Sequence, residues 1–455
     1  MTDVTLTERL AEFACGVEYG DIPYVAITKA KQCILDCFGA MLAGSAESIR
    51  DPVGGYLKAV GGREESTVVG FPTLTSAPLA ALANGVFAHV LDYDDTNQMF
   101  VGHGTAVILP AILALGEARK LSGEDAITAY MVGTEVQWKL GDALVTSGNH
   151  YGKGWHSTGT IGTLGAASAA GTMLGLDADQ MANALGIAAS EAGGFQEQFG
   201  THCKSFHAGR ANENGVNAAL LAKEGFTSSR TALDGKLGFL KVSTDRYDLS
   251  KVDRFGDPWG IMEPTVTRGI NLKMYPVCGG GVGSIEGILS LVIENNLHPE
   301  EVESVECHLR PKYSELLMYH DPVTGLQAKF SMEYWMARAI LDRKLRLGQL
   351  TDDKARDPRS REMVKRVRLV PDPDMEYPSS KVKIIVRTRD GRALEKTYFP
   401  PKGTPENPMT ETELVDKFKE CAAWGGVSEI KAGKAMNMIA ELEKLANVGD
   451  LMRSL

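Results

Sequence analysis

Residues 88–104 read AHVLDYDDTNQMFVGHG, and this stretch joins an apolar helical run to a turn rich in ionisable groups. It contains three carboxylates and two histidines: Asp92, Asp94, Asp95, His89 and His103. Aspartate and histidine are the usual proton carriers near neutral pH, and a glycine beside His103 lets a ligand approach the backbone closely. The stretch therefore predicts a proton-transfer site. The alternative is a helix that ends in an acidic loop, with His103 a structural histidine.

Helical patterns extend from this stretch in both directions. Apolar residues recur at helical spacing over residues 5–45, as two helices, and over residues 76–91. Residues 54–70 predict a loop with a short strand-like piece, STVVG. Residues 106–144 predict two more helices, with Pro110 in a first turn or at a kink. The N-terminal part of the chain is therefore expected to be helical.

One of the following helices contains almost only small side chains. Residues 160–174 read TIGTLGAASAAGTML, which permits very close approach of neighbouring helices, so we expect this helix to be central. Residues 177–190 predict a helix with Asp177 as its N-cap. Residues 196–209 are polar and predict a loop that leads into a helix over residues 211–223.

The pattern changes after about residue 266. Residues 302–309 and 364–370 alternate like strands, and residues 381–399 predict a hairpin around Asp390-Gly391. From residue 410 the chain is helical again. We therefore predict a mainly α fold with a large all-helical domain and a smaller α+β lid domain that contains an antiparallel sheet. The helical domain comprises residues 1–266 and 407–455, and the lid domain comprises residues 267–406.

Composition excludes several classes of protein. The net charge is −10, which argues against nucleic acid or an anionic membrane surface as the main partner. The seven cysteines are scattered and form no CxxC pair, which is typical of reduced thiols in a cytoplasmic protein. Residues 1–16 do not resemble a signal peptide, and residues 158–176 are too weakly hydrophobic to cross a membrane.

Two further motifs carry cations near glycines. Lys204 and His207 lie between Gly200 and Gly209, where they would hold a substrate carboxylate next to a helix N-terminus; the alternative is a surface lysine. Lys273 begins the sequence KMYPVCGGG, whose glycines precede a helix and would form an anion-binding nest.

Other site types lack their motifs. His156 follows a tryptophan, and by itself it is typical of a packed histidine. The chain contains no dinucleotide fingerprint, no phosphate-binding GxxxxGK[ST] loop, no HExxH and no GxSxG. We therefore expect no metal and no serine-hydrolase chemistry.

Five ordered motifs together resemble the MmgE/PrpD family: HVLDYDDT with a downstream HG, WHSTGTIGTLGAASAAGTMLGL, GTHCKSFHAGRANENGVNAALLAKEGFT, NLKMYPVCGGG and AKFSMEYWMARAIL. That family includes 2-methylcitrate dehydratase, cis-aconitate decarboxylase and iminodisuccinate epimerase. The chain departs from the family pattern at Gly104, where many members have proline, and at Asn212 and Glu213, in a segment usually richer in alanine.

The resemblance implies a homodimer without metal or cofactor, with its active site in the cleft between the two domains. Carried over residue by residue, the family's site falls on Asp92, Thr96, His103, His156, Lys204, Lys273 and Tyr334. Tyr334 comes from matching SMEY to an aromatic position on a lid helix. We add His207 as a substrate-binding residue.

These residues suit proton removal next to a carboxylate. Lys204 and Lys273 would neutralise the substrate carboxylates, His103 would move the proton with its tautomer fixed by Asp92, and His156 would act on the opposite face. The first hypothesis is a lyase that dehydrates a small di- or tricarboxylic hydroxy acid. The second is an epimerase of a dicarboxylate such as iminodisuccinate, and the third is a cis-aconitate decarboxylase. A non-catalytic dicarboxylate-binding scaffold is the hypothesis from another class.

Overall fold

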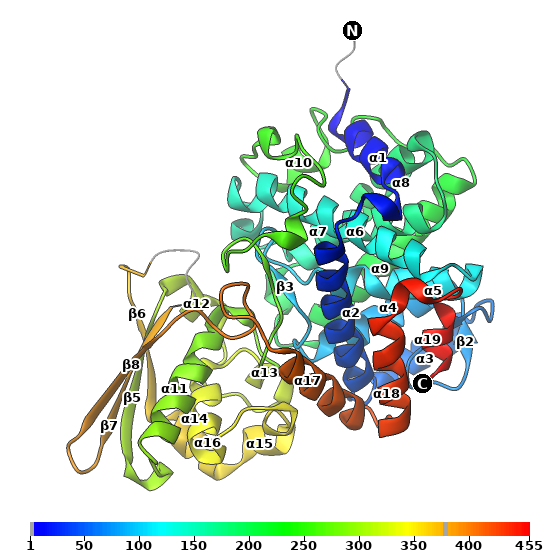
Figure 1. Cartoon of the computed structure of the whole chain (residues 1–455). Coiled ribbons are helices and arrows are strands. Elements are labelled where there is room, and N and C mark those ends of the chain that lie inside the picture. Colours follow the sequence, from blue (N-terminus) through cyan, green and yellow to red (C-terminus); the bar gives the residue numbers. More distant parts are fainter. Residues whose placement is uncertain (1–3, 376–380) are drawn as a thin grey trace.

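The computed structural model describes residues 4–375 and 381–455 and places them in two parts (Figure 1). The larger part is a bundle of helices drawn from both ends of the chain, and the smaller part combines helices with a four-stranded sheet. This architecture confirms the predicted mainly α fold. Among the described residues, no helix is both long and apolar enough to cross a membrane.

The larger part contains the first ten helices and the last three. They are α1 (Leu6–Gly16), α2 (Tyr24–Gly44), α3 (Arg50–Val60), α4 (Ala77–Val90), α5 (Leu109–Arg119), α6 (Gly123–Gly141), α7 (Ser157–Met173), α8 (Ala178–Glu191), α9 (His202–Lys223), α10 (Phe239–Ser243), α17 (Glu411–Trp424), α18 (Glu429–Ala440) and α19 (Gly449–Arg453). Two short antiparallel pairs accompany them: β1 (Ser66–Thr67) with β2 (Leu74–Thr75), and β3 (Thr96–Asn97) with β4 (Ile270–Asn271).

Helix α9 lies at the centre of this bundle, packed against α4 on one side and α7 on the other. Glycines allow both contacts. A Cβ atom on Gly209 would lie 2.6 Å from the carbonyl oxygen of Leu82 in α4, and one on Gly215 would lie 2.5 Å from the Cβ of Ala166 in α7. The small residues of α7 are thus central, as predicted, and they bring three helix ends close together.

Among its described residues, the smaller part contains six helices and four strands: α11 (Val282–Glu294), α12 (Pro311–Leu316), α13 (Gly325–Ala328), α14 (Met332–Asp342), α15 (Asp352–Arg356), α16 (Pro358–Val364), β5 (Val302–Leu309), β6 (Val367–Pro371), β7 (Val382–Thr388) and β8 (Ala393–Tyr398). The strand order is β6-β5-β7-β8. The hairpin β7–β8 turns at Gly391, whose φ of 88° suits glycine. The pair β5–β6 is parallel, so the sheet is mixed and not wholly antiparallel as predicted.

Two hydrophobic cores divide the molecule. One core joins residues 6–272 to residues 414–452 and includes Leu347, and the other joins residues 275–386. The chain therefore leaves the helical part, builds the lid, and returns through α17, which packs on α2 (Figure 1). The predicted domain boundaries at residues 266 and 406 lie near these changes and stay a prediction.

Three local predictions are wrong. Residues 54–60, predicted as part of a loop over residues 54–70, belong to the helix α3, which tolerates Pro52 in its first turn. Helix α9 begins at His202 and not near residue 211, because the Thr201 side chain accepts a hydrogen bond from the Cys203 amide after the turn at Gly200. Strand β6 begins at Val367, since Val364 still belongs to α16.

Candidate active site

Three helix ends and one strand converge on a single buried region. The C-terminus of α4 contributes His89 and the turn that follows it, the N-terminal turns of α9 contribute Lys204 and His207, and the N-terminus of α7 contributes His156. The pairing of β3 with β4 brings Lys273 to the same place, because Thr96 pairs with Asn271. The close packing of α4, α9 and α7 therefore builds the site.

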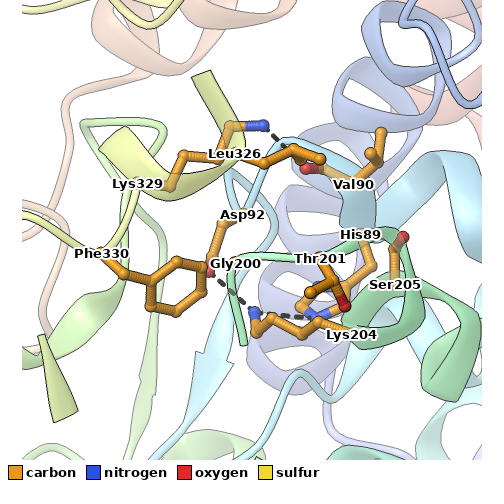
Figure 2. A pocket seen from close by; sticks show the side chains of 10 residues that line it. All are labelled: His89, Val90, Asp92, Gly200, Thr201, Lys204, Ser205, Leu326, Lys329 and Phe330. Carbon is orange, nitrogen blue, oxygen red and sulfur yellow. Dashed lines mark hydrogen bonds and ion pairs between the residues drawn. The ribbon is translucent and has the colours of Figure 1, made fainter. Parts of the chain in front are cut away.

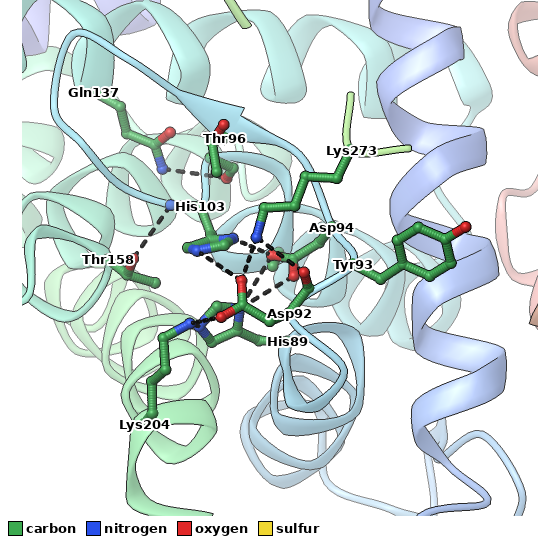
Figure 3. Close-up of polar contacts among 12 residues, drawn as sticks. His89, Asp92, Tyr93, Asp94, Thr96, His103, Gln137, Thr158, Lys204 and Lys273 are labelled. Carbon is green, nitrogen blue, oxygen red and sulfur yellow. Dashed lines mark hydrogen bonds and ion pairs between the residues drawn. The ribbon is translucent and has the colours of Figure 1, made fainter. Parts of the chain in front are cut away.

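Asp92 is the shared partner of both lysines (Figure 3). Its φ of 52° reverses the chain after α4, a conformation that aspartate tolerates better than most residues. Its Oδ2 accepts a hydrogen bond from Lys204 Nζ at 2.7 Å, and its Oδ1 pairs with Lys273 Nζ. Burial alone would raise the pKa of Asp92, but Lys204 and Lys273 hold it well below its usual value.

Asp94 is the shared partner of two imidazoles. His89 Nδ1 lies 3.1 Å from Asp94 Oδ1, and His103 Nδ1 lies 2.9 Å from Asp94 Oδ2. Burial would raise the pKa of Asp94, but the two histidines hold it well below its usual value. A charged Asp94 favours the tautomer with the proton on Nδ1 of each ring. His89 Nε2 then accepts a hydrogen bond from Lys204 Nζ at 3.0 Å. His103 Nε2 is left as a basic nitrogen, 3.6 Å from Asp92 Oδ1.

His103 is neutral in this arrangement. Burial lowers its pKa to about 3, against the attraction of Asp94. Its backbone amide donates to the hydroxyl of Thr158 at 3.2 Å, which ties it to the start of α7. The sequence assigned the orientation of this ring to Asp92, but in the structure the carboxylate nearest Nδ1 is that of Asp94.

A second histidine pair lies beside the first. Nδ1 of His156 is 2.9 Å from Nδ1 of His207, and the His156 ring lies 6.0 Å from the His89 ring between centroids. Burial and the nearby Lys204 hold the pKa of His156 well below its usual value, and burial lowers the pKa of His207 to about 4. Four neutral imidazoles thus follow one another from His207 to His103.

The lid closes the site over Lys204 (Figure 2). The ammonium group lies 5.4 Å from the ring centroid of Phe199 and 5.3 Å from that of Phe330, which belongs to the lid. The cavity here has a volume of about 10 Å³, with Leu326 and Lys329 also in its wall. Lys329 Nζ donates to the carbonyl oxygen of Val90 at the end of α4 at 2.8 Å. About one water molecule needs this much space, so the cavity in this structure is too small for a larger ligand.

The structure brings together seven of the eight predicted site residues: Asp92, Thr96, His103, His156, Lys204, His207 and Lys273. The predicted alternative of a surface lysine is wrong for Lys204, whose side chain is 8% exposed. Tyr334 is not brought to the site. It lies in the core of the lid, and its hydroxyl donates to the carbonyl oxygen of Gln349.

Four residues of the site region were not proposed from the sequence. His89 and Asp94 lie in the stretch that opened the sequence analysis, and their signal was the density of ionisable residues there. Lys329 and Phe330 are the last two residues of Ala328-Lys329-Phe330 at the start of the lid motif, and no local pattern singled them out for a role in the site.

One group of described residues has the geometry to hold a metal ion. The ligand atoms of His89, Asp94 and His103 lie within 4.8 Å of one another. Both imidazoles already contact Asp94 through Nδ1, so a metal would have to displace those contacts. The arrangement is equally suited to holding two imidazoles in one tautomer.

Fold and site together define a class of protein. Its members are mainly helical, carry an inserted α+β lid, and bury lysines, carboxylates and imidazoles between the lid and the helical part. The chain belongs to the MmgE/PrpD family: the model of the MmgE/PrpD N-terminal domain matches residues 8–251, and that of the C-terminal domain matches residues 275–443. This confirms the resemblance found in the sequence.

Similar proteins include cis-aconitate decarboxylases from animals and a fungus. The protein of that name from Homo sapiens is 28% identical over 431 residues, which cover 92% of this chain and 88% of that protein. The Mus musculus protein is 27% identical, covering 98% and 92%. The Aspergillus terreus protein is 26% identical, covering 99% and 96%.

Proposed function

We propose that this protein is a lyase that acts without a cofactor on a small tricarboxylic or dicarboxylic acid. The observation that carries the proposal is the buried charge at the domain boundary. Two lysines, Lys204 and Lys273, share one carboxylate, that of Asp92, in a region shielded from water. Two ammonium groups with a single carboxylate between them leave positive charge for a second carboxylate, which favours binding of an anion.

His103 supplies the proton transfer in this proposal. Its Nε2 is the basic nitrogen that faces the lysines, and the carboxylates of a bound acid would raise the pKa of this ring toward neutrality. The lysines would then stabilise the negative charge that develops on the substrate. His156 and His207 form a second proton-carrying pair within the same region.

Decarboxylation of a cis-aconitate-like acid is the first candidate reaction, because the similar proteins carry that name. The bond between the methylene carbon and its carboxylate breaks and releases carbon dioxide. Its electron pair forms a terminal alkene, the former double bond shifts its pair to the other α-carbon, and His103 protonates that carbon. Dehydration of a 2-methylcitrate-like hydroxy acid, the first hypothesis from the sequence, is the second candidate, with epimerisation third.

Proton NMR in deuterated water tests the proposal with a panel of cis-aconitate, 2-methylcitrate, citrate and iminodisuccinate. We expect itaconate with one deuterium in its saturated CH2 group, on the carbon that His103 protonates, and none in its alkene CH2. New alkene signals from a hydroxy acid would identify a dehydratase, and deuterium at an α-carbon without elimination would identify an epimerase. Binding without turnover, seen as a shift in melting temperature, would favour the scaffold. If no acid reacts or binds, the proposal is wrong.

A chelator tests the expected absence of a metal. We expect turnover to be unchanged after dialysis against EDTA. Loss of turnover that one divalent cation restores would assign His89, Asp94 and His103 as metal ligands. The homodimer implied by the resemblance also stays a prediction, which sedimentation equilibrium tests.

A further inference from the structure

We propose that Lys417, in the returning helix α17, is a positioning residue that holds Lys273 and the Asp92–Asp94 turn in register with each other. The inference rests on the proposed function, because it concerns the same reaction site. Lys417 does not face the cavity or the imidazoles, and its distance along the chain from the other site residues hides any such role in the sequence.

The ammonium group of Lys417 is fully engaged. Its Nζ donates to the carbonyl oxygen of Tyr93 at 2.7 Å and to the carbonyl oxygen of Lys273 at 2.8 Å, and it pairs with Asp36 of α2. Its side chain is 1% exposed and the ammonium lies 4.0 Å from the ring centroid of Tyr93. One cation therefore joins four segments that are far apart in sequence.

Each backbone acceptor belongs to the reaction site. Tyr93 lies between Asp92, which holds the two lysines, and Asp94, which holds the two imidazoles. The other acceptor is the carbonyl of Lys273 itself. The β3–β4 pair links the same two segments through Thr96 and Asn271, so Lys417 acts as a second clamp beside the Lys273–Asp92 contact. Loss of the clamp would let Lys273 shift relative to Asp92.

Stability alone does not require an ion pair here. Taking Lys417 and Asp36 out of water is costly, and apolar side chains of similar size often replace a buried pair without loss of stability. Burial raises the pKa of Asp36 although Lys417 opposes this, which agrees with such a cost. The two backbone contacts, by contrast, need a donor. This difference separates a positioning role from a structural one.

The main test compares Lys417→Met with the double variant Asp36→Leu/Lys417→Met, using the substrate on which the parent protein is active. We expect Lys417→Met to lower kcat by about 10-fold to 100-fold, because small misplacements of catalytic groups have effects of this size. We expect the apolar pair to restore the melting temperature without restoring kcat. Lys419→Met, an exposed change on the same helix, is the matched control and should behave as the parent does.

A second comparison tests whether Lys417 acts through Lys273. In a Lys273→Met background, we expect Lys417→Met to lower kcat/KM by a smaller factor than it does in the parent, because the group being positioned is already absent. A purely structural role predicts the same factor in both backgrounds.

Several results would overturn the inference. The inference is wrong if Lys417→Met keeps the parental kcat, or if the double variant recovers it. It is also wrong if Lys417→Met lowers kcat/KM by the same factor in the parent and in the Lys273→Met background, or if the double variant does not fold. If the parent protein itself turns over none of the acids, the proposed function fails, and that outcome is distinct from failure of the Lys417 variants.

Discussion

His103 is the residue on which the proposed chemistry depends most. Replacing it by Ala removes the basic nitrogen that faces the lysines, and we expect kcat to fall by about 10²-fold to 10⁴-fold with little change in melting temperature. Steady-state kinetics with the acid identified by NMR measures the effect. His298→Ala, at an exposed histidine of the lid, is the control. Unchanged turnover in His103→Ala would assign proton transfer to another imidazole.

The buried carboxyl group of Asp95 should make the stability of the protein depend on pH. Burial, aided by Asp94 and Asp36, raises the pKa of Asp95 to about 7, although hydrogen bonding to Thr105 opposes this. In the unfolded chain this group ionises near pH 3.8. Between these values the native state binds one more proton than the unfolded state, so its contribution to stability is present below pH 3.8 and is lost as pH rises to about 7.

Asp95→Asn removes this titration. We expect its stability relative to the parent protein to increase by about 1.4 kcal/mol per pH unit up to about pH 7 and then to level off. Melting temperatures of the two proteins between pH 5 and pH 8 test this. A difference that does not vary with pH would mean that Asp95 is ionised in the native state.

Residue chemistry predicted part of the site from the sequence and missed another part. Asp92, His103, Lys204 and Lys273 were chosen because ionisable groups stood beside turns or glycines, and the structure brings them together. Tyr334 was placed by motif matching alone. A motif gives the position of a residue on a helix but does not tell which face of the helix packs inward. In the structure the Tyr334 hydroxyl is directed to the lid core, where it donates to the carbonyl oxygen of Gln349.

The elements show the same division between pattern and packing. Residues 76–91 and the small-residue helix had clear helical patterns and formed α4 and α7. The start of α9 was missed because its first turns carry site residues in place of an apolar stripe. When functional side chains replace the apolar positions of a helix, its hydrophobic periodicity is lost and the sequence is predicted as a loop.

Because α7 and α9 are in close contact, we expect the addition of one methyl group between them to lower the stability of the protein. Gly215→Ala would place a Cβ 2.5 Å from Ala166 Cβ, so we expect destabilisation by about 1–3 kcal/mol. Gly433→Ala in α18 is the matched control, because no atom lies within 4 Å of its added Cβ and a helical glycine gains about 0.5–1 kcal/mol on this change. Thermal melting separates the two. An unaffected Gly215→Ala protein would mean that α7 and α9 are farther apart.

For the molecule as a whole, the cavity of about 10 Å³ is too small for any of the proposed acids, so the proposed reaction would require the lid to move. Lys329 connects the lid to α4 through Val90. We expect Lys329→Met to speed amide exchange in residues 324–332 and to raise KM, because the lid loses a buried hydrogen bond. Hydrogen–deuterium exchange measures this, with the exposed Lys312→Met as control. Unchanged exchange would place the moving contact elsewhere.

The two-part architecture was predictable because the sequence changes from helical spacing to alternation and back. The contacts between the parts were not. Lys329 of the lid contacts Val90 of the helical part, 239 positions away, and no local pattern encodes such a pair. The same holds within the helical part for Lys417 and Tyr93, which are 324 positions apart.

The returning C-terminal helices also set the order in which the molecule can be completed during synthesis. Asp92 and Lys204 leave the ribosome before Lys273, and Lys417 emerges another 144 residues later. The N-terminal helices therefore have to wait, with part of their apolar surface uncovered, until α17 can pack on α2. A nascent chain that stalls before α17 lacks the Lys417 contacts, so we expect such products to bind chaperones instead of substrate.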